Sequence, residues 1–325
     1  MIRISISAFI IISLAVTFTA CNKSIGVSSS TTGWPYDYKA ENAFRGSTGF
    51  SSQVPPGMVE IPGGSFVVDD ADEFETANRR IRPNELNTRR TLSVNSFYID
   101  KHEIRNIDWR EYLNWLTAVY ANVAPEIIER AKPDINAWKK GLSDNEPFLM
   151  NYFTHPSFNE YPVVCITWEQ AAAYCAWRSD RANELLLIKA GVIQAPNFRA
   201  IAEMTTLEAV ENAIFTSKKF FTGQQDNLEK TYTGMYPDFR LPSEDEWEFA
   251  AYARKNTDPE NKIRVYPWAE KSQGKLSQLQ RSQQQAHYNQ NGANINSNVF
   301  SRTVPVGSFA PNDFGLYNMA GNVNE

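Results

Sequence analysis

Four acidic residues within residues 239–253 are the first candidates for chemistry: Glu244, Asp245, Glu246 and Glu248. Carboxyl groups that lie close together can serve as a general acid and a general base. The same stretch carries the signature of a helix start, because Ser243 and Glu246 form a capping-box pattern. Acidic residues in a first helical turn are also stabilised by the helix dipole. The sequence therefore predicts a well-specified helix, and we assign no catalytic role to these carboxylates.

Thiols and imidazoles are the other candidate nucleophiles and metal ligands. Cys165 closes a strand-like run and Cys175 lies well along the next predicted helix, a separation that does not suit the geometry of a disulfide. Neither has a neighbouring charge or histidine that would lower the pKa of its thiol. The three histidines, His102, His155 and His287, are far apart and lack the spacing of a metal site. We therefore predict two separate thiols and no catalytic residue.

A third cysteine, Cys21, follows a segment with the features of an export signal. Arg3 precedes an apolar run over residues 4–18, which is shorter than a membrane-spanning helix, and small residues lead into Cys21. This pattern resembles a lipoprotein signal, so residues 1–20 are predicted to be a signal peptide and Cys21 the lipidated residue. The alternative is an ordinary signal peptide with an incidental cysteine. Residues 21–57 are rich in Ser, Thr and Gly and are predicted to form a lipidated flexible tether, in which Trp34 and Tyr36 are candidates for docking.

Composition limits the class of the mature protein. The 325 residues are 42% hydrophobic and 13% aromatic, which is enough for a substantial core. The net charge is −5, and the positive charges are scattered along the chain. Because a nucleic-acid surface needs an excess of positive charge, we predict no nucleic-acid partner.

Short elements must position these residues. Two short strands are expected over residues 58–68, another over 92–99 and a buried one over 162–166. Asn106 is expected to cap a helix with an aromatic face, and Thr167 with Gln170 forms a second capping box that starts a helix over 168–178. Residues from about 179 to 238 look like an insertion within a domain that spans 58–325.

Several of these segments, in this order, resemble the formylglycine-generating-enzyme domain, also called the sulfatase-modifying-factor domain. They are residues 58–66, 97–106, 161–177, 239–253, 266–268 and 304–325. The resemblance implies an α+β fold of C-type-lectin character, with short strands, few helices and much ordered loop. Residues 31–37 and 321–325 further resemble the J-type gliding-motility lipoproteins within this superfamily.

The resemblance also implies a function. Enzymes of the superfamily oxidise a substrate cysteine with a cysteine pair and copper(I), a metal that thiolates suit. That pair lies in the family's C-terminal part, so the chain looks truncated at its C-terminus, and no copper is expected. We predict a non-catalytic outer-membrane lipoprotein on the periplasmic face. Its expected role is that of a structural component of the gliding-motility and type IX secretion machinery. Its expected partners are other lipoproteins of that machinery and outer-membrane components. The alternatives are a formylglycine-generating oxidase acting on sulfatase cysteines and a lectin-like binding module.

Structural calcium is the one metal that the resemblance implies. The matching ligands are the carbonyls of Gly321 and Val323 and the side chain of Glu325, while Asn294 and Ile295 are remnants of a second site. Oxygen ligands on a loop suit calcium. The alternative is a loop held together by hydrogen bonds of its Asn and Gly residues.

Overall fold

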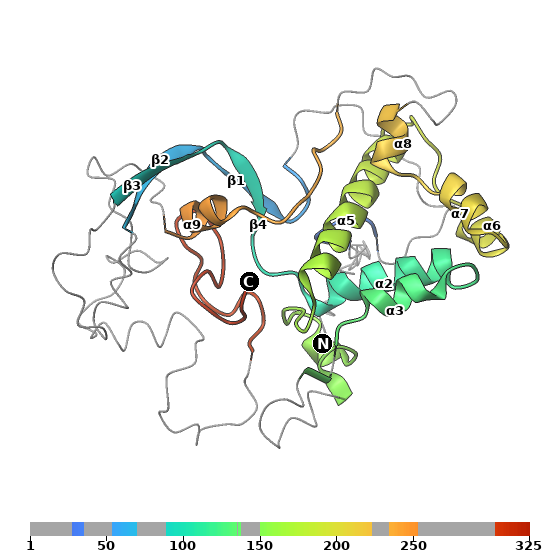
Figure 1. Ribbon diagram of the computed structural model, residues 1–325, viewed down its shortest axis with the longest axis horizontal. Coiled ribbons are helices and arrows are strands. Elements are labelled where there is room, and N and C mark those ends of the chain that lie inside the picture. Colours follow the sequence, from blue (N-terminus) through green and yellow to red (C-terminus); the bar gives the residue numbers. More distant parts are fainter. Residues whose placement is uncertain are drawn as a thin grey trace, which may run out of the picture.

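The computed structural model describes residues 28–35, 54–69, 89–134, 136–137, 150–222, 234–252 and 303–325. Most helices gather on one side, and the strands lie on the other side with helix α9 and the C-terminal segment (Figure 1). The elements are β1 (Met58–Ile61), β2 (Gly64–Asp69), β3 (Arg89–Val94), β4 (Phe97–Asp100), α2 (Asn106–Tyr120), α3 (Pro125–Ala131), η3 (Pro156–Phe158), α5 (Trp168–Lys189), α6 (Phe198–Ala202), α7 (Leu207–Ala213), α8 (Ser217–Thr222) and α9 (Glu244–Tyr252).

The strands form two antiparallel pairs. β1 pairs with β4, with Met58 opposite Asp100, and β2 pairs with β3, with Gly64 opposite Val94. The tight connection between β1 and β2 requires a glycine, because a Cβ on Gly63 would lie 2.8 Å from the carbonyl oxygen of Val94. These short strands, kept apart from most of the helices, give the predicted α+β architecture.

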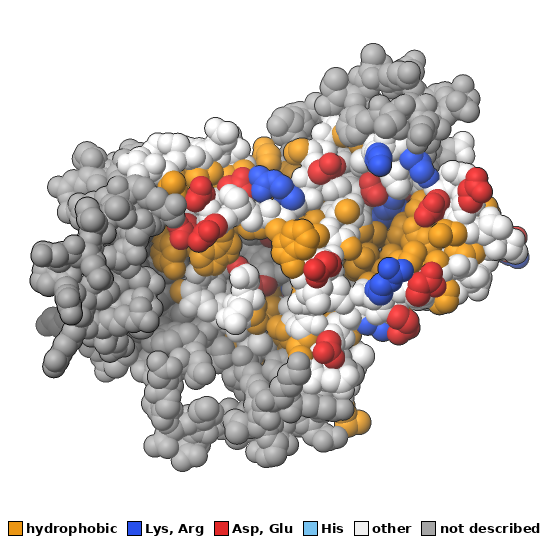
Figure 2. Space-filling model, in the orientation of Figure 1, with side chains coloured by type: hydrophobic (Ala, Val, Ile, Leu, Met, Phe, Trp, Pro, Cys, Tyr) orange, Lys and Arg blue, Asp and Glu red, His pale blue; other side chains and the backbone are white. Residues whose placement is uncertain are grey.

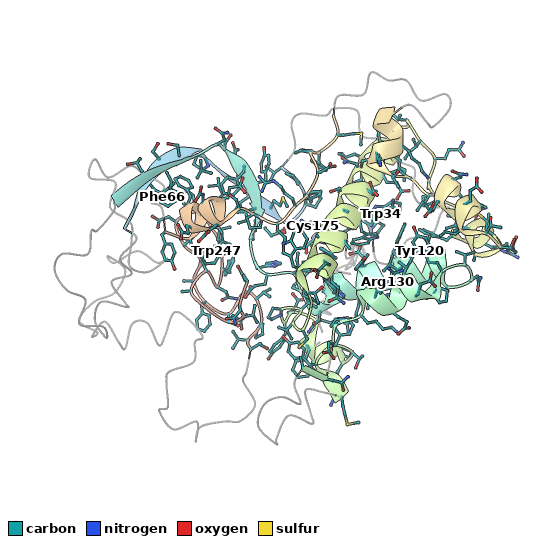
Figure 3. The ribbon with its side chains drawn as sticks, in the orientation of Figure 1. Trp34, Phe66, Tyr120, Arg130, Cys175 and Trp247 are labelled. Atoms are coloured by element: carbon teal, nitrogen blue, oxygen red, sulfur yellow. The ribbon has the colours of Figure 1, made fainter. Side chains whose placement is uncertain are left out.

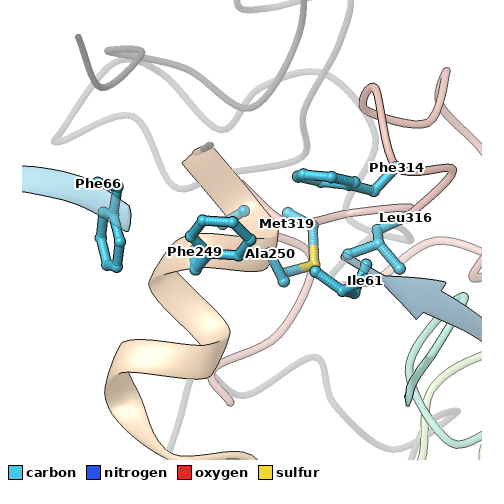
Figure 4. Close-up of a cluster of buried hydrophobic side chains, with 8 residues drawn as sticks. Ile61, Phe66, Phe249, Ala250, Phe314, Leu316 and Met319 are labelled. Atoms are coloured by element: carbon cyan, nitrogen blue, oxygen red, sulfur yellow. The ribbon is translucent and has the colours of Figure 1, made fainter. Parts of the chain in front are cut away.

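One hydrophobic core lies between the strands, α9 and the C-terminal segment (Figure 4). Phe249 of α9 meets Phe66 of β2 edge to face, with ring centroids 5.4 Å apart, and meets Phe314 at 6.0 Å. Ile61 and Ala250 are fully buried in the same cluster. The segment after residue 303 therefore supplies core residues although it contains no described helix or strand.

A second core joins α2 to α5 through aromatic rings. Trp109 stacks on Tyr174 with centroids 5.1 Å apart, and Tyr112 packs against Trp177 at 5.0 Å. The Nε1 of Trp109 donates to the carbonyl of Ala131 at 3.0 Å, which ties α3 to the pair. Aromatic side chains bury large areas, and Ala131 of α3 and Val163 complete this core.

The start of α2 differs from the sequence prediction. Arg105, not Asn106, is the N-cap, and Asp108 accepts a hydrogen bond from the backbone N–H of Arg105 at 3.1 Å. Asn106 is instead the first helical residue and is fully buried. Its Nδ2 donates to the carbonyls of Tyr152 and Phe158, both at 3.0 Å. Asn106 therefore joins α2 to residues 152 and 158 and does not cap the helix.

Two further expectations are corrected around α5. Residues 162–166 form no strand, since only Pro162 makes an isolated bridge, to Arg105, and Cys165 has a φ of 63°. The capping box of Thr167 and Gln170 is confirmed, but α5 continues eleven residues past 178, because its apolar residues 186–188 are buried. Helices α6, α7 and α8 follow in the expected insertion. None of the described helices has both the length and the apolar character that crossing a bilayer requires.

Candidate functional site

The acidic cluster of residues 244–248 stabilises the start of α9. The Ser243 Oγ accepts from the backbone N–H of Glu246 at 3.2 Å, and the Glu246 carboxylate accepts from that of Ser243 at 2.8 Å. Arg240 binds both oxygens of Glu246, at 2.7 and 2.6 Å. These hydrogen bonds from Arg240 lower the pKa of Glu246 to about 2. Glu246 is thus a permanent anion engaged in capping, as the sequence predicts.

The two described thiols are separate, as predicted. Cys165 and Cys175 are both free and half-buried. Burial raises the pKa of each thiol, and the Cys175 pKa is raised despite the positive charge of Arg178 nearby. Cys175 lies on α5, where Figure 3 labels it. Since the thiolate is the reactive form, neither cysteine is poised as a nucleophile at neutral pH.

The described histidines have local backbone contacts. The His102 Nδ1 lies 2.9 Å from the carbonyl oxygen of Glu103, and His155 accepts from the backbone N–H of Ser157 at the start of η3. His287 lies outside the described residues. Within the described part of the chain, no three His, Cys, Asp or Glu residues are grouped so as to hold a metal ion. On the face shown in Figure 2, Lys and Arg side chains alternate with Asp and Glu.

A buried carboxyl group, Glu103, organises the C-terminal loop. Both of its oxygens accept from the Asn318 Nδ2 at 3.1 Å, and one also accepts from the Asn322 Nδ2 at 2.8 Å. Burial raises the pKa of Glu103 to about 7, because desolvation outweighs these hydrogen bonds. No local feature of the sequence marks Glu103, because its partners Asn318 and Asn322 lie more than two hundred positions away.

The residues that match calcium ligands lie in this loop. Glu325 is exposed, and its carboxylate accepts from the Trp247 Nε1 at 2.7 Å. The Asn318 Oδ1 is buried and accepts no hydrogen bond from the described residues. Carbonyl and carboxylate oxygens such as those of Gly321, Val323 and Glu325 are ligands that suit calcium. The chemistry of the three predicted ligands, Gly321, Val323 and Glu325, therefore fits a calcium ion.

The alternative, a loop held by its own hydrogen bonds, also has direct support. The Asn322 side chain accepts from the backbone N–H of Val304 at 2.8 Å and donates to the Val304 carbonyl at 3.1 Å. Asn318 and Asn322 both have positive φ angles, of 56° and 79°, which asparagine tolerates in turns. The calcium site therefore remains a prediction. Asn294 and Ile295 lie outside the described residues.

Residues 28–35 form a small hairpin that we call the N-terminal clip. Ser28 and Pro35 form an isolated antiparallel bridge, and the backbone N–H of Ser29 donates to the Trp34 carbonyl at 2.7 Å. Gly33 closes the turn with a φ of 79°, a conformation that favours glycine. Three polar residues of the clip are buried: Ser29, Thr31 and Thr32.

The clip is bonded to the first turns of α2. The Arg105 Nη2 donates to the Ser30 Oγ at 2.7 Å, and the Thr32 Oγ1 donates to the Glu111 carboxylate at 2.7 Å. Burial raises the pKa of Glu111 to about 7. Arg105 also forms an ion pair with Asp108 at 2.8 Å, so the clip covers a network of charged groups.

The clip is bonded to α5 as well, through Arg178 and Trp34. The Arg178 Nε donates to the Thr31 carbonyl at 2.8 Å, and its Nη2 donates to the Pro56 carbonyl at 2.9 Å. The Trp34 Nε1 donates to the Arg181 carbonyl at 2.8 Å, and Figure 3 shows Trp34 beside α5. The docking considered for Trp34 is therefore present.

This docked clip differs from the flexible tether expected over residues 21–57. Ser30 and Thr32 bond charged side chains of α2, and Arg178 of α5 bonds the Thr31 carbonyl. Residues 54–57 are also part of the described structure. Cys21 and Tyr36 lie outside the described residues. No local pattern in the sequence indicates the clip, because its partners are 75 to 147 positions away.

Sequence similarity places the chain among known proteins. The formylglycine-generating enzyme of Mus musculus is 23% identical over 289 residues, which cover 82% of this chain and 56% of that protein. The inactive C-alpha-formylglycine-generating enzyme 2 of Mus musculus is 24% identical over 295 residues, covering 83% of this chain and 68% of that protein. The formylglycine-generating enzyme of Thermomonospora curvata is 23% identical over 295 residues, covering 84% of this chain and 71% of that protein.

The chain thus spans just over half the length of the mouse enzyme. Among solved structures, Treponema denticola variable protein 1 aligns with a TM-score of 0.36 and 19% identity, covering 82% of this chain and 70% of that chain. The model of the sulfatase-modifying factor enzyme 1-like domain matches residues 46–325. This match covers most of the sequence, including the two hydrophobic cores described above. The chain therefore belongs to the family of sulfatase-modifying factor enzyme 1-like domains.

Proposed function

We propose that this protein is a non-catalytic, lipid-anchored component of the gliding-motility and type IX secretion machinery, held on the periplasmic face of the outer membrane. The lipoprotein-like signal before Cys21 and the resemblance of residues 31–37 and 321–325 to the J-type gliding lipoproteins support this role. Its partners are other lipoproteins and outer-membrane components of the same machinery. The domain provides a rigid surface for them.

The docked N-terminal clip is the observation that carries this proposal. The clip begins seven residues after Cys21 and is bonded to α2 through Thr32 and to α5 through Trp34. A lipid on Cys21 is therefore connected to the folded domain by a short link. A scaffold that transmits force or position from a membrane needs such a connection, whereas oxidation of a substrate cysteine does not.

A non-catalytic role is also supported by the chemistry of the described cysteines and by the relatives. The pKa values of Cys165 and Cys175 are raised by burial, which favours the unreactive thiol. The relatives include a protein named as inactive at 24% identity, close to the 23% of the named enzymes. Membership of the family is therefore compatible with a structural role.

Cross-linking in intact cells tests this proposal. The full chain carries an affinity tag, and the cross-linked material from outer membranes is identified by mass spectrometry. Motility and secretion lipoproteins should be recovered with the wild-type chain, and a Cys21→Ser chain should lose them together with membrane attachment. Recovery of no outer-membrane component of this machinery with the wild-type chain would refute the proposed function.

A formylglycine-generating oxidase is the second candidate, and the 23% identity to the mouse and Thermomonospora enzymes favours it. The assay incubates the full chain with copper and a cysteine-containing sulfatase peptide, and mass spectrometry detects the aldehyde. The mouse enzyme serves as a positive control. Aldehyde in the positive control alone would exclude this candidate, whereas turnover by the present chain would exclude a non-catalytic protein.

A further inference from the structure

We infer that the domain lies directly against the bilayer, with one defined face toward the lipid headgroups. This face, the clip face, comprises the N-terminal clip and residues 54–57. The inference rests on the lipid anchor proposed above and adds the orientation of the domain on the membrane.

Chain length sets the limit on separation. Seven residues lead from Cys21 to Ser28, and a fully extended chain of seven residues spans at most about 25 Å. The only charged residue in this link is Lys23, a cation that suits anionic headgroups. Without the clip, the next residue that the structure describes is Val54, and an extended chain from Cys21 to it spans at most about 115 Å. Docking of the clip therefore sets the maximum distance between the domain and the membrane.

The contacts of the clip determine which face is held. Residues 54–57 lie against the clip, because a Cβ on Gly57 would meet the Ser30 carbonyl oxygen at 2.4 Å and one on Gly33 would lie 3.4 Å from Pro56. Val54, at the end of this segment, is 47% exposed and offers an apolar contact beside the anchor. The clip face is thus continuous, and it includes Ser28, the first described residue after Cys21.

The opposite end of the helical half is kept away from the membrane. Ser30 and Thr32 of the clip bond side chains at the start and in the first turns of α2. Helix α7 packs near the other end of α2, where Val210 and Val119 share a hydrophobic cluster. Residues 108 and 119 of α2 are separated by about 16 Å along the helix axis. Glu208 of α7 is exposed and marks this distant end, which Figure 1 shows at the edge of the molecule.

Energy transfer on vesicles tests the orientation. The full-length lipidated chain with Cys165→Ser and Cys175→Ser receives a single labelled cysteine, either Val54→Cys or Glu208→Cys, in vesicles that contain a headgroup-labelled acceptor lipid. Transfer should be stronger from position 54 than from position 208. In a Thr32→Val/Gly33→Ala chain, which removes a clip hydrogen bond and strains its turn, position 54 should lose this advantage. Thr117→Val, which alters an exposed threonine of α2, should leave it unchanged.

A second variant covers the case in which the clip substitutions unfold the protein. A twenty-residue Gly/Ser linker inserted after Lys23 leaves the clip intact but lengthens the link, so transfer from both positions should fall. Incorporation of labelled palmitate is measured on every chain. Absence of palmitate from the wild-type chain would overturn the proposed anchor and this inference together. Palmitate with equal transfer from positions 54 and 208, or with no effect of the linker, would overturn the orientation alone.

Discussion

Arg178 of α5 binds both carboxylate oxygens of Asp100 at the end of β4, at 2.6 and 2.8 Å. Burial acts to lower the pKa of Arg178, but the charge and hydrogen bonds of Asp100 outweigh it and raise this pKa. The same guanidinium donates to the Thr31 carbonyl in the clip. One side chain therefore connects the helical half, the strand half and the N-terminal clip.

Replacing Arg178 should destabilise the protein strongly. Arg178→Lys retains a positive charge but cannot reproduce the paired hydrogen bonds to Asp100 together with those to Thr31 and Pro56. Because disruption of a buried ion pair typically costs about 3–5 kcal/mol, we expect a loss of about 3 kcal/mol in the free energy of unfolding, measured by urea titration. Arg199→Lys, at an exposed pair 3.8 Å long, is the control and should change it by less than about 0.5 kcal/mol. Equal effects of the two substitutions would contradict the joining role of Arg178.

Removing the Thr32 hydroxyl should loosen the clip. Thr32→Val preserves the shape of the side chain but leaves the buried Glu111 carboxyl without its 2.7 Å donor. A lost partner of a buried polar group costs about 1–3 kcal/mol, and protease cleavage within the clip should become faster. The matched control is Thr117→Val on the exposed side of α2. A Thr32→Val chain as stable and protease-resistant as this control would show that the contact contributes nothing.

The protein should lose stability as the pH rises from about 4.5 through 7. Burial raises the pKa values of Glu103 and Glu111 from 4.5 to about 7, so in this interval the folded protein retains protons that the unfolded chain has released. The stabilisation is therefore complete at low pH and is lost as the pH passes the folded pKa, by on the order of 3 kcal/mol for each carboxyl.

Urea titrations at pH 5 and pH 8 measure this effect. Glu111→Gln, which resembles the neutral carboxyl, should reduce the difference between the two pH values. Glu160→Gln, on a carboxylate whose side chain is 58% exposed, should leave that difference intact. Stability that increases from pH 5 to pH 8 in the wild-type chain would show that these carboxyl groups are ionised in the folded protein.

Calcium should stabilise the C-terminal loop if the family's ligands are used. With Gly321, Val323 and Glu325 as the oxygen donors, added calcium should raise the melting temperature, and Glu325→Gln should abolish the rise. Asp245→Asn, on the first turn of α9, is the control and should retain it. An unchanged melting temperature at millimolar calcium would leave the hydrogen bonds of Asn322 as the support of this loop.

Local signals in the sequence predicted the features that depend on neighbouring residues. The capping boxes of Thr167 with Gln170 and of Ser243 with Glu246 involve side chains three positions apart, and both are present. The two cysteines were predicted to be separate for a similarly local reason, namely their position along a helix. The resemblance of several short segments supplied the family and its α+β fold.

The features that the sequence did not indicate depend on distant partners. The clip is composed of small polar residues, which locally resemble a tether, and only the buried charges of α2 and α5 make them structural. Glu103 is a single acid between a strand and a helix, and its role depends on Asn318 and Asn322, far along the chain. Asn106 was mistaken for a cap because its buried partners are 46 and 52 positions away.

Replacement of the chromosomal gene tests the central claim, that the protein acts as a structural component anchored through Cys21. Cells that carry the Cys21→Ser chain and cells that carry the Cys165→Ser/Cys175→Ser chain are compared for secretion and surface motility, at matched protein levels. We predict that loss of the anchor cysteine abolishes both activities, whereas loss of the two other thiols leaves them unchanged. Normal motility and secretion with Cys21→Ser, or their loss with Cys165→Ser/Cys175→Ser, would contradict the account.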